Sequence, residues 1–129
     1  MKANVLVDTS IWIEYFNKPD SKAGKSLENL LKKGRVFITG IILTELLQGA
    51  KIKKEFEYIL ENMLALPFLE TTLSTWIQSG RISFVLRKKG ITIPITDLVI
   101  ASLSLENNCK IFTLDLHFNK IPNINIFSN

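Results

Sequence analysis

Aspartate is rare in this chain of 129 residues, and its positions are informative. Only four aspartates occur, at positions 8, 20, 97 and 115. Asp8 directly follows the apolar run Val5–Val7, Asp115 directly follows a second apolar run, and Asp97 lies in the first turn of a helix expected just after Pro94. Ligands of open α/β sheets bind outside the carboxyl ends of the strands, so we expect Asp8 and Asp115 at one edge of a sheet.

Each acid taken singly also has an ordinary structural explanation. Aspartate is favoured at helix N-caps, where its side chain accepts hydrogen bonds from backbone N–H groups. Glu45 lies within the apolar stretch 41–47, where a glutamate by default faces outward from an amphipathic helix and otherwise points into the site. Asp20 follows Pro19 in a turn, and we expect a purely structural role for it.

Acids that converge on one point repel one another, unless protons or a divalent cation neutralise them. Mg²⁺ and Mn²⁺ prefer oxygen ligands, and a chain with one histidine and one cysteine offers no imidazole or thiolate cluster for zinc. The sequence therefore predicts a carboxylate site for Mg²⁺, with Mn²⁺ as the other candidate.

The elements that must position these acids alternate between strands and helices. Apolar and β-branched runs predict strands at 5–7, 36–38, 66–69, 110–114 and 124–127. Helical periodicity and turn residues predict helices at 10–16, 22–33, 41–48, 51–64, 71–89 and 96–107, and a short helical turn at 115–119. This alternation is typical of an α/β fold in which helices cover both faces of a mostly parallel sheet.

The composition is that of a folded protein. With 47% hydrophobic and 22% charged residues it excludes a disordered or collagen-like chain, and the length predicts a single domain over residues 1–129. No apolar run approaches the roughly 20 residues of a membrane span, so we expect no membrane association. One cysteine, Cys109, and no Asn-x-Ser/Thr sequon favour a reducing cytoplasm.

The net charge of +4 and the pI near 9.3 are compatible with an anionic partner. When the acids at 8, 45, 97 and 115 are left out, the chain has sixteen basic and eight acidic side chains, which predicts a basic surface around the site. The candidate phosphate contacts are Lys32, Lys33, Arg35, Arg87, Lys88 and Lys89. The same residues are equally well explained as cations that favour helix C-termini.

Four motifs occur in order along the chain: Leu6–Ile13, Thr44–Gly49, Pro94–Ala101 and Thr113–Phe118. With these motifs the chain resembles the PIN-domain ribonucleases, and among them the VapC toxins. The resemblance runs from residue 5 to the final strand. It implies a three-layer α/β/α fold around a mostly parallel sheet of five strands, in the order 3-2-1-4-5.

The resemblance also implies a site, an activity and partners. Asp8, Glu45, Asp97 and Asp115 would form an acidic site that binds Mg²⁺ and hydrolyses RNA, and the hydroxyls of Thr9, Ser10 and Thr113 would support it. A VapB-type antitoxin would cover the apolar stretch Ile11–Phe16 and block the site. That stretch could instead be wholly buried between neighbouring helices. A homodimer is implied as well.

Two other functions stay open: a PIN nuclease of RNA processing that is no toxin, and a catalytically silent RNA-binding module. Gly24-Lys25-Ser26 is not a phosphate-binding loop, because Pro19 occupies the place of its first glycine. A phosphatase of the haloacid dehalogenase type is excluded, because Ser10 stands where its second acid belongs. The single histidine, His117, argues against a metal-free mechanism, and we expect it to support the site or to pack.

Overall fold

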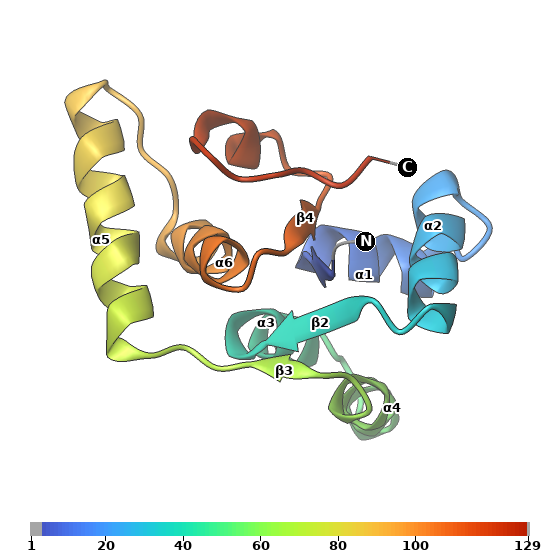
Figure 1. The fold of residues 1–129 in the computed structure, drawn as a ribbon. Coiled ribbons are helices and arrows are strands. Elements are labelled where there is room, and N and C mark those ends of the chain that lie inside the picture. The colour runs from blue at the N-terminus through green and yellow to red at the C-terminus, as the bar shows by residue number, and fades with distance from the viewer. Residues whose placement is uncertain (1–3, 129) are drawn as a thin grey trace.

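A sheet of four parallel strands lies at the centre of the fold (Figure 1). The computed structural model describes residues 4–128, so residues 1–3 and 129 of the predicted domain lie outside the described residues. The sheet has the order β3-β2-β1-β4, and its strands are β1 (Val5–Val7), β2 (Val36–Thr39), β3 (Phe68–Leu69) and β4 (Lys110–Phe112). All three residues of β1 are buried, because the strand pairs with β2 and β4 and is covered on both faces.

Six helices and one 3₁₀ helix surround the sheet. They are α1 (Thr9–Asn17), α2 (Lys22–Lys32), α3 (Gly40–Gln48), α4 (Lys53–Leu64), α5 (Leu73–Lys88), α6 (Ile95–Glu106) and the 3₁₀ helix η1 (Leu116–Lys120). The chain adds β2 and β3 on one side of β1 and then returns to place β4 on the other side. Figure 1 accordingly shows α5 and α6 on one side of the sheet and α2 and α4 on the other. In the described part of the chain, no helix is both long and apolar enough to cross a membrane.

The expectation of five strands is wrong, since the segment 124–127 forms one isolated β-bridge and no strand. The amide of Ile111 donates to the carbonyl of Asn125 at 2.9 Å, and the amide of Phe127 donates to the carbonyl of Ile111 at 2.8 Å. Asn123, with a φ of 71°, lies in the turn before this segment, and the segment meets β4 at one residue only. The order 3-2-1-4 is confirmed, and the segment expected as the fifth strand lies beside β4.

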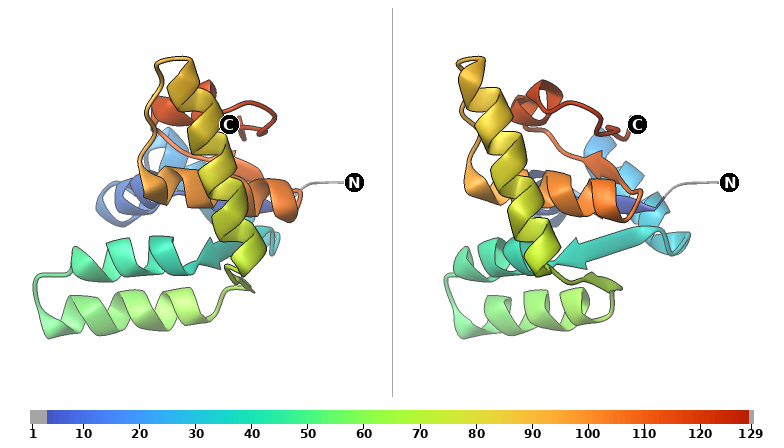
Figure 2. Two further views of the ribbon diagram at one scale, coloured as in Figure 1. Left: turned by 90° about the vertical axis from the view of Figure 1, so that its left-hand side faces the viewer. Right: turned by 60° about the vertical axis from the view of Figure 1, so that its left-hand side comes forward.

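The outer helices are less buried than their sequence pattern predicts. The helix expected over 51–64 is present as α4, which runs beside α3 (Figure 2), but Met63 is its only buried residue. Helix α5 likewise leaves Leu73, Trp76 and Phe84 exposed. Helix α6 has a continuous buried run from Leu98 to Ser104. The fold therefore keeps α6 in its core and leaves apolar side chains of α4 and α5 uncovered.

Candidate acidic active site

Asp8 is held at the carboxyl end of β1 by two hydroxyl groups. Thr113 Oγ1 donates to Asp8 Oδ2 at 2.8 Å, and Ser10 Oγ donates to the same oxygen at 3.1 Å. The backbone of Asp8 occupies the N-cap position of α1, but the side chain makes no capping hydrogen bond. Capping therefore does not explain the position of this aspartate. Asp8 is buried, with 7% of its surface exposed.

The same hydroxyls end β4 and turn the chain toward η1. The amide of Leu114 donates to Ser10 Oγ at 3.0 Å, and the amide of Asp115 donates to Thr113 Oγ1 at 2.9 Å. These bonds replace sheet hydrogen bonds, so the strand ends at Phe112, two residues earlier than expected. Asp115 does act as a cap, since its Oδ1 accepts the amide of His117 at 2.9 Å.

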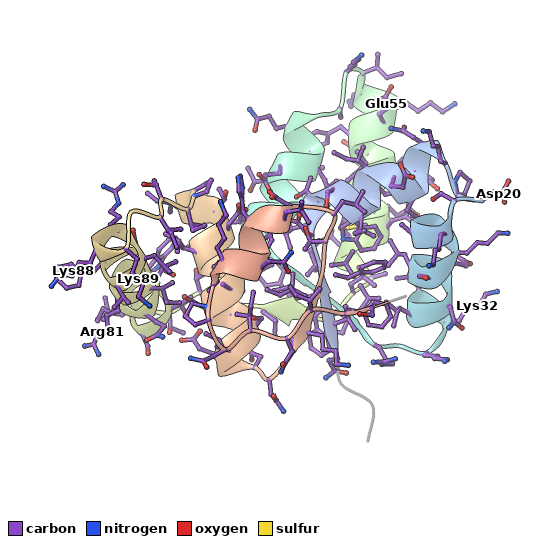
Figure 3. All side chains as sticks on the ribbon, turned by 90° about the horizontal axis from the view of Figure 1, so that it is seen from above. Asp20, Lys32, Glu55, Arg81, Lys88 and Lys89 are labelled. Carbon is purple, nitrogen blue, oxygen red and sulfur yellow. The ribbon has the colours of Figure 1, made fainter. Side chains whose placement is uncertain are left out.

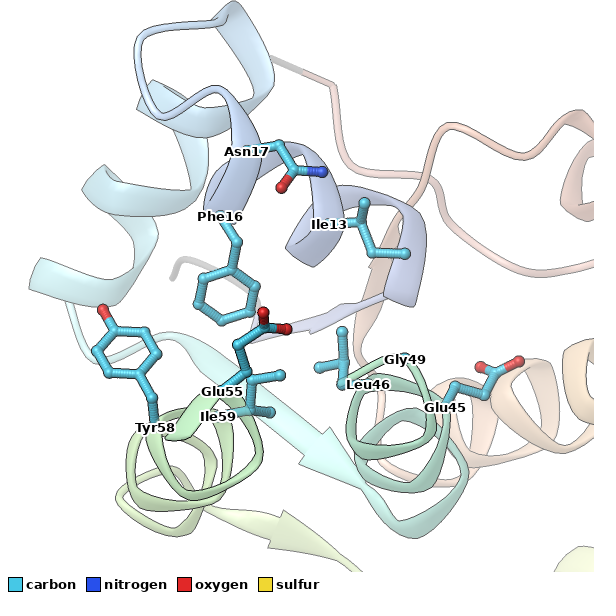
Figure 4. Close-up of a pocket in the computed structure, with 9 residues that line it drawn as sticks. All are labelled: Ile13, Phe16, Asn17, Glu45, Leu46, Gly49, Glu55, Tyr58 and Ile59. Carbon is cyan, nitrogen blue, oxygen red and sulfur yellow. The ribbon is translucent and has the colours of Figure 1, made fainter. Parts of the chain in front are cut away.

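Glu45 points into the site, and the default expectation of an outward glutamate is wrong. Thr9 Oγ1, at the start of α1, donates to Glu45 Oε1 at 2.7 Å. Helices α1 and α3 follow neighbouring parallel strands and pack against each other, which brings Thr9 and Glu45 together. In Figure 4 the Glu45 carboxylate points away from Phe16 and Tyr58, toward the side of the molecule occupied by α6.

Asp97 lies in the first turn of α6, and burial together with the three other acids raises its pKa. Burial is the largest cause that raises the pKa of Asp97 to about 6, followed by the negative charges of Asp115 and Asp8. His117 opposes this rise in pKa, and Glu45 adds to it. The structure thus brings the four acids, which the sequence spreads over 108 positions from 8 to 115, to one edge of the sheet.

His117 lies in direct contact with two of the acids, whereas the sequence predicted only a supporting or packing role. Its Nδ1 lies 3.2 Å from Asp115 Oδ1 and 3.7 Å from Asp97 Oδ2. Asp97, Asp115 and His117 each offer one ligand atom, and these atoms all lie within 4.8 Å of one another, so the group could hold a metal ion. The only signal in the sequence was a histidine two residues beyond an acid that ends a strand.

An apolar groove between α1, α3 and α4 borders the acidic site. It has a volume of about 470 Å³ and is lined by Ile13, Phe16, Asn17, Glu45, Leu46, Gly49, Glu55, Tyr58 and Ile59 (Figure 4). Ile11 and Trp12 are buried, but Ile13 is 49% exposed and faces the groove. The alternative in which the whole stretch 11–16 is buried is therefore wrong, because one face of α1 is left open.

The basic residues considered as phosphate contacts lie away from one another. Figure 3 shows Lys88 and Lys89 at one side of the molecule and Lys32 at the opposite side. Lys88 Nζ lies 4.5 Å from the centroid of the Phe84 ring, which gives this cation a partner within α5. A role of these residues in RNA binding stays a prediction. Asp20 lies exposed in the turn before α2.

Comparisons with known proteins agree with this architecture. A family model described as PIN domain matches residues 5–124. Ribonuclease VapC11 of Mycobacterium tuberculosis is 30% identical over 125 residues, which cover 93% of this chain and 92% of that protein. Ribonuclease VapC2 of Rickettsia felis is 29% identical over 124 residues, or 92% of either chain.

Two solved structures of toxin–antitoxin complexes have the same fold. A chain of VapBC2 from Rickettsia felis, bound to a DNA fragment from its promoter, matches with a TM-score of 0.81 at 27% identity, over 95% of this chain and 96% of that chain. A chain of DNA-bound VapBC from Salmonella typhimurium matches with a TM-score of 0.77 at 26% identity, over 98% of each chain.

Proposed function

Because the chain belongs to the PIN-domain family, we propose that it is a metal-dependent endoribonuclease and the toxin of a VapBC pair. The observation that carries the proposal is the convergence of Asp8, Glu45, Asp97 and Asp115, which come from four separate segments of the chain. Convergent negative charge destabilises a protein unless a cation is bound there, so the cluster is better explained by function than by folding.

The donor set suits a hard divalent cation, and we propose Mg²⁺ held by Asp8, Asp97 and Asp115, with Glu45 serving a second ion or its water. When bound, the cation supplies positive charge to the phosphate in the transition state and lowers the pKa of a water nucleophile. The chain's own hydroxyls do the positioning. Ser10 and Thr113 hold Asp8, and Thr9 holds Glu45.

The substrate we propose is RNA in the cytoplasm. The ribonuclease names of the relatives support it, and so does the surplus of sixteen basic over eight acidic side chains outside the four acids of the site. The single cysteine, Cys109, is buried and free, which fits a reducing compartment.

Two partners are proposed for two separate surfaces. A VapB-type antitoxin would lie in the apolar groove, and because Glu45 belongs to both the groove and the acidic site, a segment lying there would obstruct access to the acids. A second copy of the chain would cover the exposed apolar residues of α5, a helix that lies on the other side of the sheet from α4 (Figure 1). The antitoxin is supported by the similar solved structures, which are VapBC complexes.

Cleavage of labelled RNA by the purified chain tests the activity. We expect cleavage with Mg²⁺ and none with EDTA, and Asp8→Asn or Asp97→Asn should lower the rate at least about 100-fold while the fold persists. Asp20→Asn is the matched control, because it removes the same charge from an exposed turn. Undiminished cleavage by a folded Asp8→Asn or Asp97→Asn variant contradicts the proposal.

Expression of the chain without its antitoxin tests the toxin assignment separately. We expect growth arrest that Asp97→Asn relieves. An active but harmless enzyme would instead support a nuclease of RNA processing. RNA binding that EDTA does not change, without cleavage, would support the silent binding module.

A further inference from the structure

We propose that His117 is a ligand of the cation at the acidic site, and that its imidazole shifts the preference of the site from Mg²⁺ toward Mn²⁺. This inference rests on the proposed function, which supplies the cation, and it concerns the identity of the ion and of one ligand. The carboxylates alone do not distinguish the two ions, because oxygen ligands suit both Mg²⁺ and Mn²⁺.

The spacing of the donor atoms is the first argument. Two ligands that hold one ion at about 2.1 Å lie about 3.0 Å apart when they are adjacent in an octahedron and about 4.2 Å apart when they are opposite. His117 Nδ1 lies 3.2 Å from Asp115 Oδ1 and 3.7 Å from Asp97 Oδ2. Both distances fall in the range that a shared ion requires.

The way in which His117 is held is the second argument. Asp115 caps η1 by accepting the amide of His117 at 2.9 Å, and this fixes the histidine backbone beside the carboxylates. The side chain of His117 remains 49% exposed, so burial of the ring in the core does not account for its position. The ring instead lies beside the two carboxylates, with Nδ1 within 3.7 Å of an oxygen of each.

The chemistry of the donors then determines the choice of metal. Carboxylates suit Mg²⁺ and Mn²⁺, and imidazole suits transition metals far better than it suits Mg²⁺. Mn²⁺ accepts both kinds of ligand, whereas the low number of nitrogen and sulfur donors does not favour zinc. A site that contains the carboxylates of Asp97 and Asp115 and the imidazole of His117 therefore prefers Mn²⁺.

Metal binding to the full chain without RNA tests the inference. Pulsed EPR of bound Mn²⁺ should show the modulation of a directly coordinated nitrogen, and His117→Ala should abolish it. Calorimetry should show that His117→Ala weakens Mn²⁺ binding at least about tenfold and Mg²⁺ binding less than about threefold. Asn119→Ala, an exposed substitution on the same 3₁₀ helix, should leave both affinities unchanged.

The possible results separate the inference from the function on which it rests. Mn²⁺ binding without nitrogen modulation, or an equal loss of both metals in His117→Ala, overturns the role of His117 and leaves the proposed nuclease intact. Failure of the native chain to bind either ion overturns both. Because His117 is exposed, a thermal unfolding curve of His117→Ala close to that of the native chain will confirm that the variant is folded.

Discussion

The acidic site and the outer helices α4 and α5 differ in how their side chains are satisfied. At the site, Asp8 and Glu45 accept hydrogen bonds from neighbouring hydroxyls, and Asp115 accepts a backbone amide. On α4 and α5, large apolar side chains such as Tyr58 and Trp76 are 58% and 49% exposed. The acids of the site therefore find hydrogen-bond donors within the chain but keep an excess of negative charge. The apolar side chains of α4 and α5 are left without a surface that covers them.

This difference fits the two kinds of partner proposed above, a cation for the acidic site and a protein surface for the outer helices. Excess charge is relieved by an ion, and exposed apolar area is relieved by another protein surface. Substitutions in one region should therefore change cleavage and metal binding, and substitutions in the other should change association.

Glu45→Gln should lower the rate of RNA cleavage about 100-fold, because it removes a charge that lies within the acid cluster. Glu57→Gln, an exposed change on α4, should leave the rate within about twofold. Initial rates on one labelled RNA measure both. Equal losses in the two variants would show that net charge, and not the cluster, controls cleavage.

Tyr58→Ala should weaken binding of the proposed VapB-type antitoxin by about 30-fold, the loss typical of an aromatic hot spot. Tyr58 lines the groove and is largely exposed, so its removal should disturb folding little. Trp76→Ala removes an exposed aromatic residue of α5 and should leave this affinity unchanged. Titration calorimetry compares the two, and a larger loss in Trp76→Ala would move the antitoxin to α5.

Trp76→Glu should shift the free chain from dimer to monomer, with the dimer dissociation constant raised at least about tenfold, because a charge would enter an apolar contact. Light scattering over a concentration series measures this. Tyr58→Glu is the reciprocal control and should remain dimeric. A native chain that is monomeric at all concentrations would rule out the dimer.

The metal-free chain should lose thermal stability as the pH rises from about 4 to about 6. The pKa of Asp97 is raised to about 6 in the folded state from an ordinary value of 3.8, so its neutral form favours folding and this contribution is lost as Asp97 ionises. Asp97→Asn should abolish this part of the pH dependence, and Asp20→Asn should retain it. The unfolding temperature of the native metal-free chain should fall by several degrees over this pH range. Identical slopes for the native chain and Asp97→Asn would contradict the raised pKa of Asp97, to which burial contributes most and the neighbouring acids contribute further.

Much of the fold followed from local sequence pattern. The helices and the first four strands were predicted within a few residues, because their apolar spacing and their turn residues act locally. The end of β4 was missed by two residues, since it depends on Ser10, more than a hundred positions away. The fifth strand was predicted wrongly at 124–127, because this segment pairs with β4 only through the single bridge to Ile111.

The sequence by itself determined which acids lie at strand ends and helix starts, since those positions depend on neighbours in the chain. Only the tertiary structure decided that Glu45 turns inward to Thr9 and that His117 lies beside Asp97 and Asp115. It also decided that the apolar residues of α4 and α5 stay uncovered. The direction of a side chain and the covering of a helix face depend on packing between segments far apart in sequence, and no local pattern records that packing.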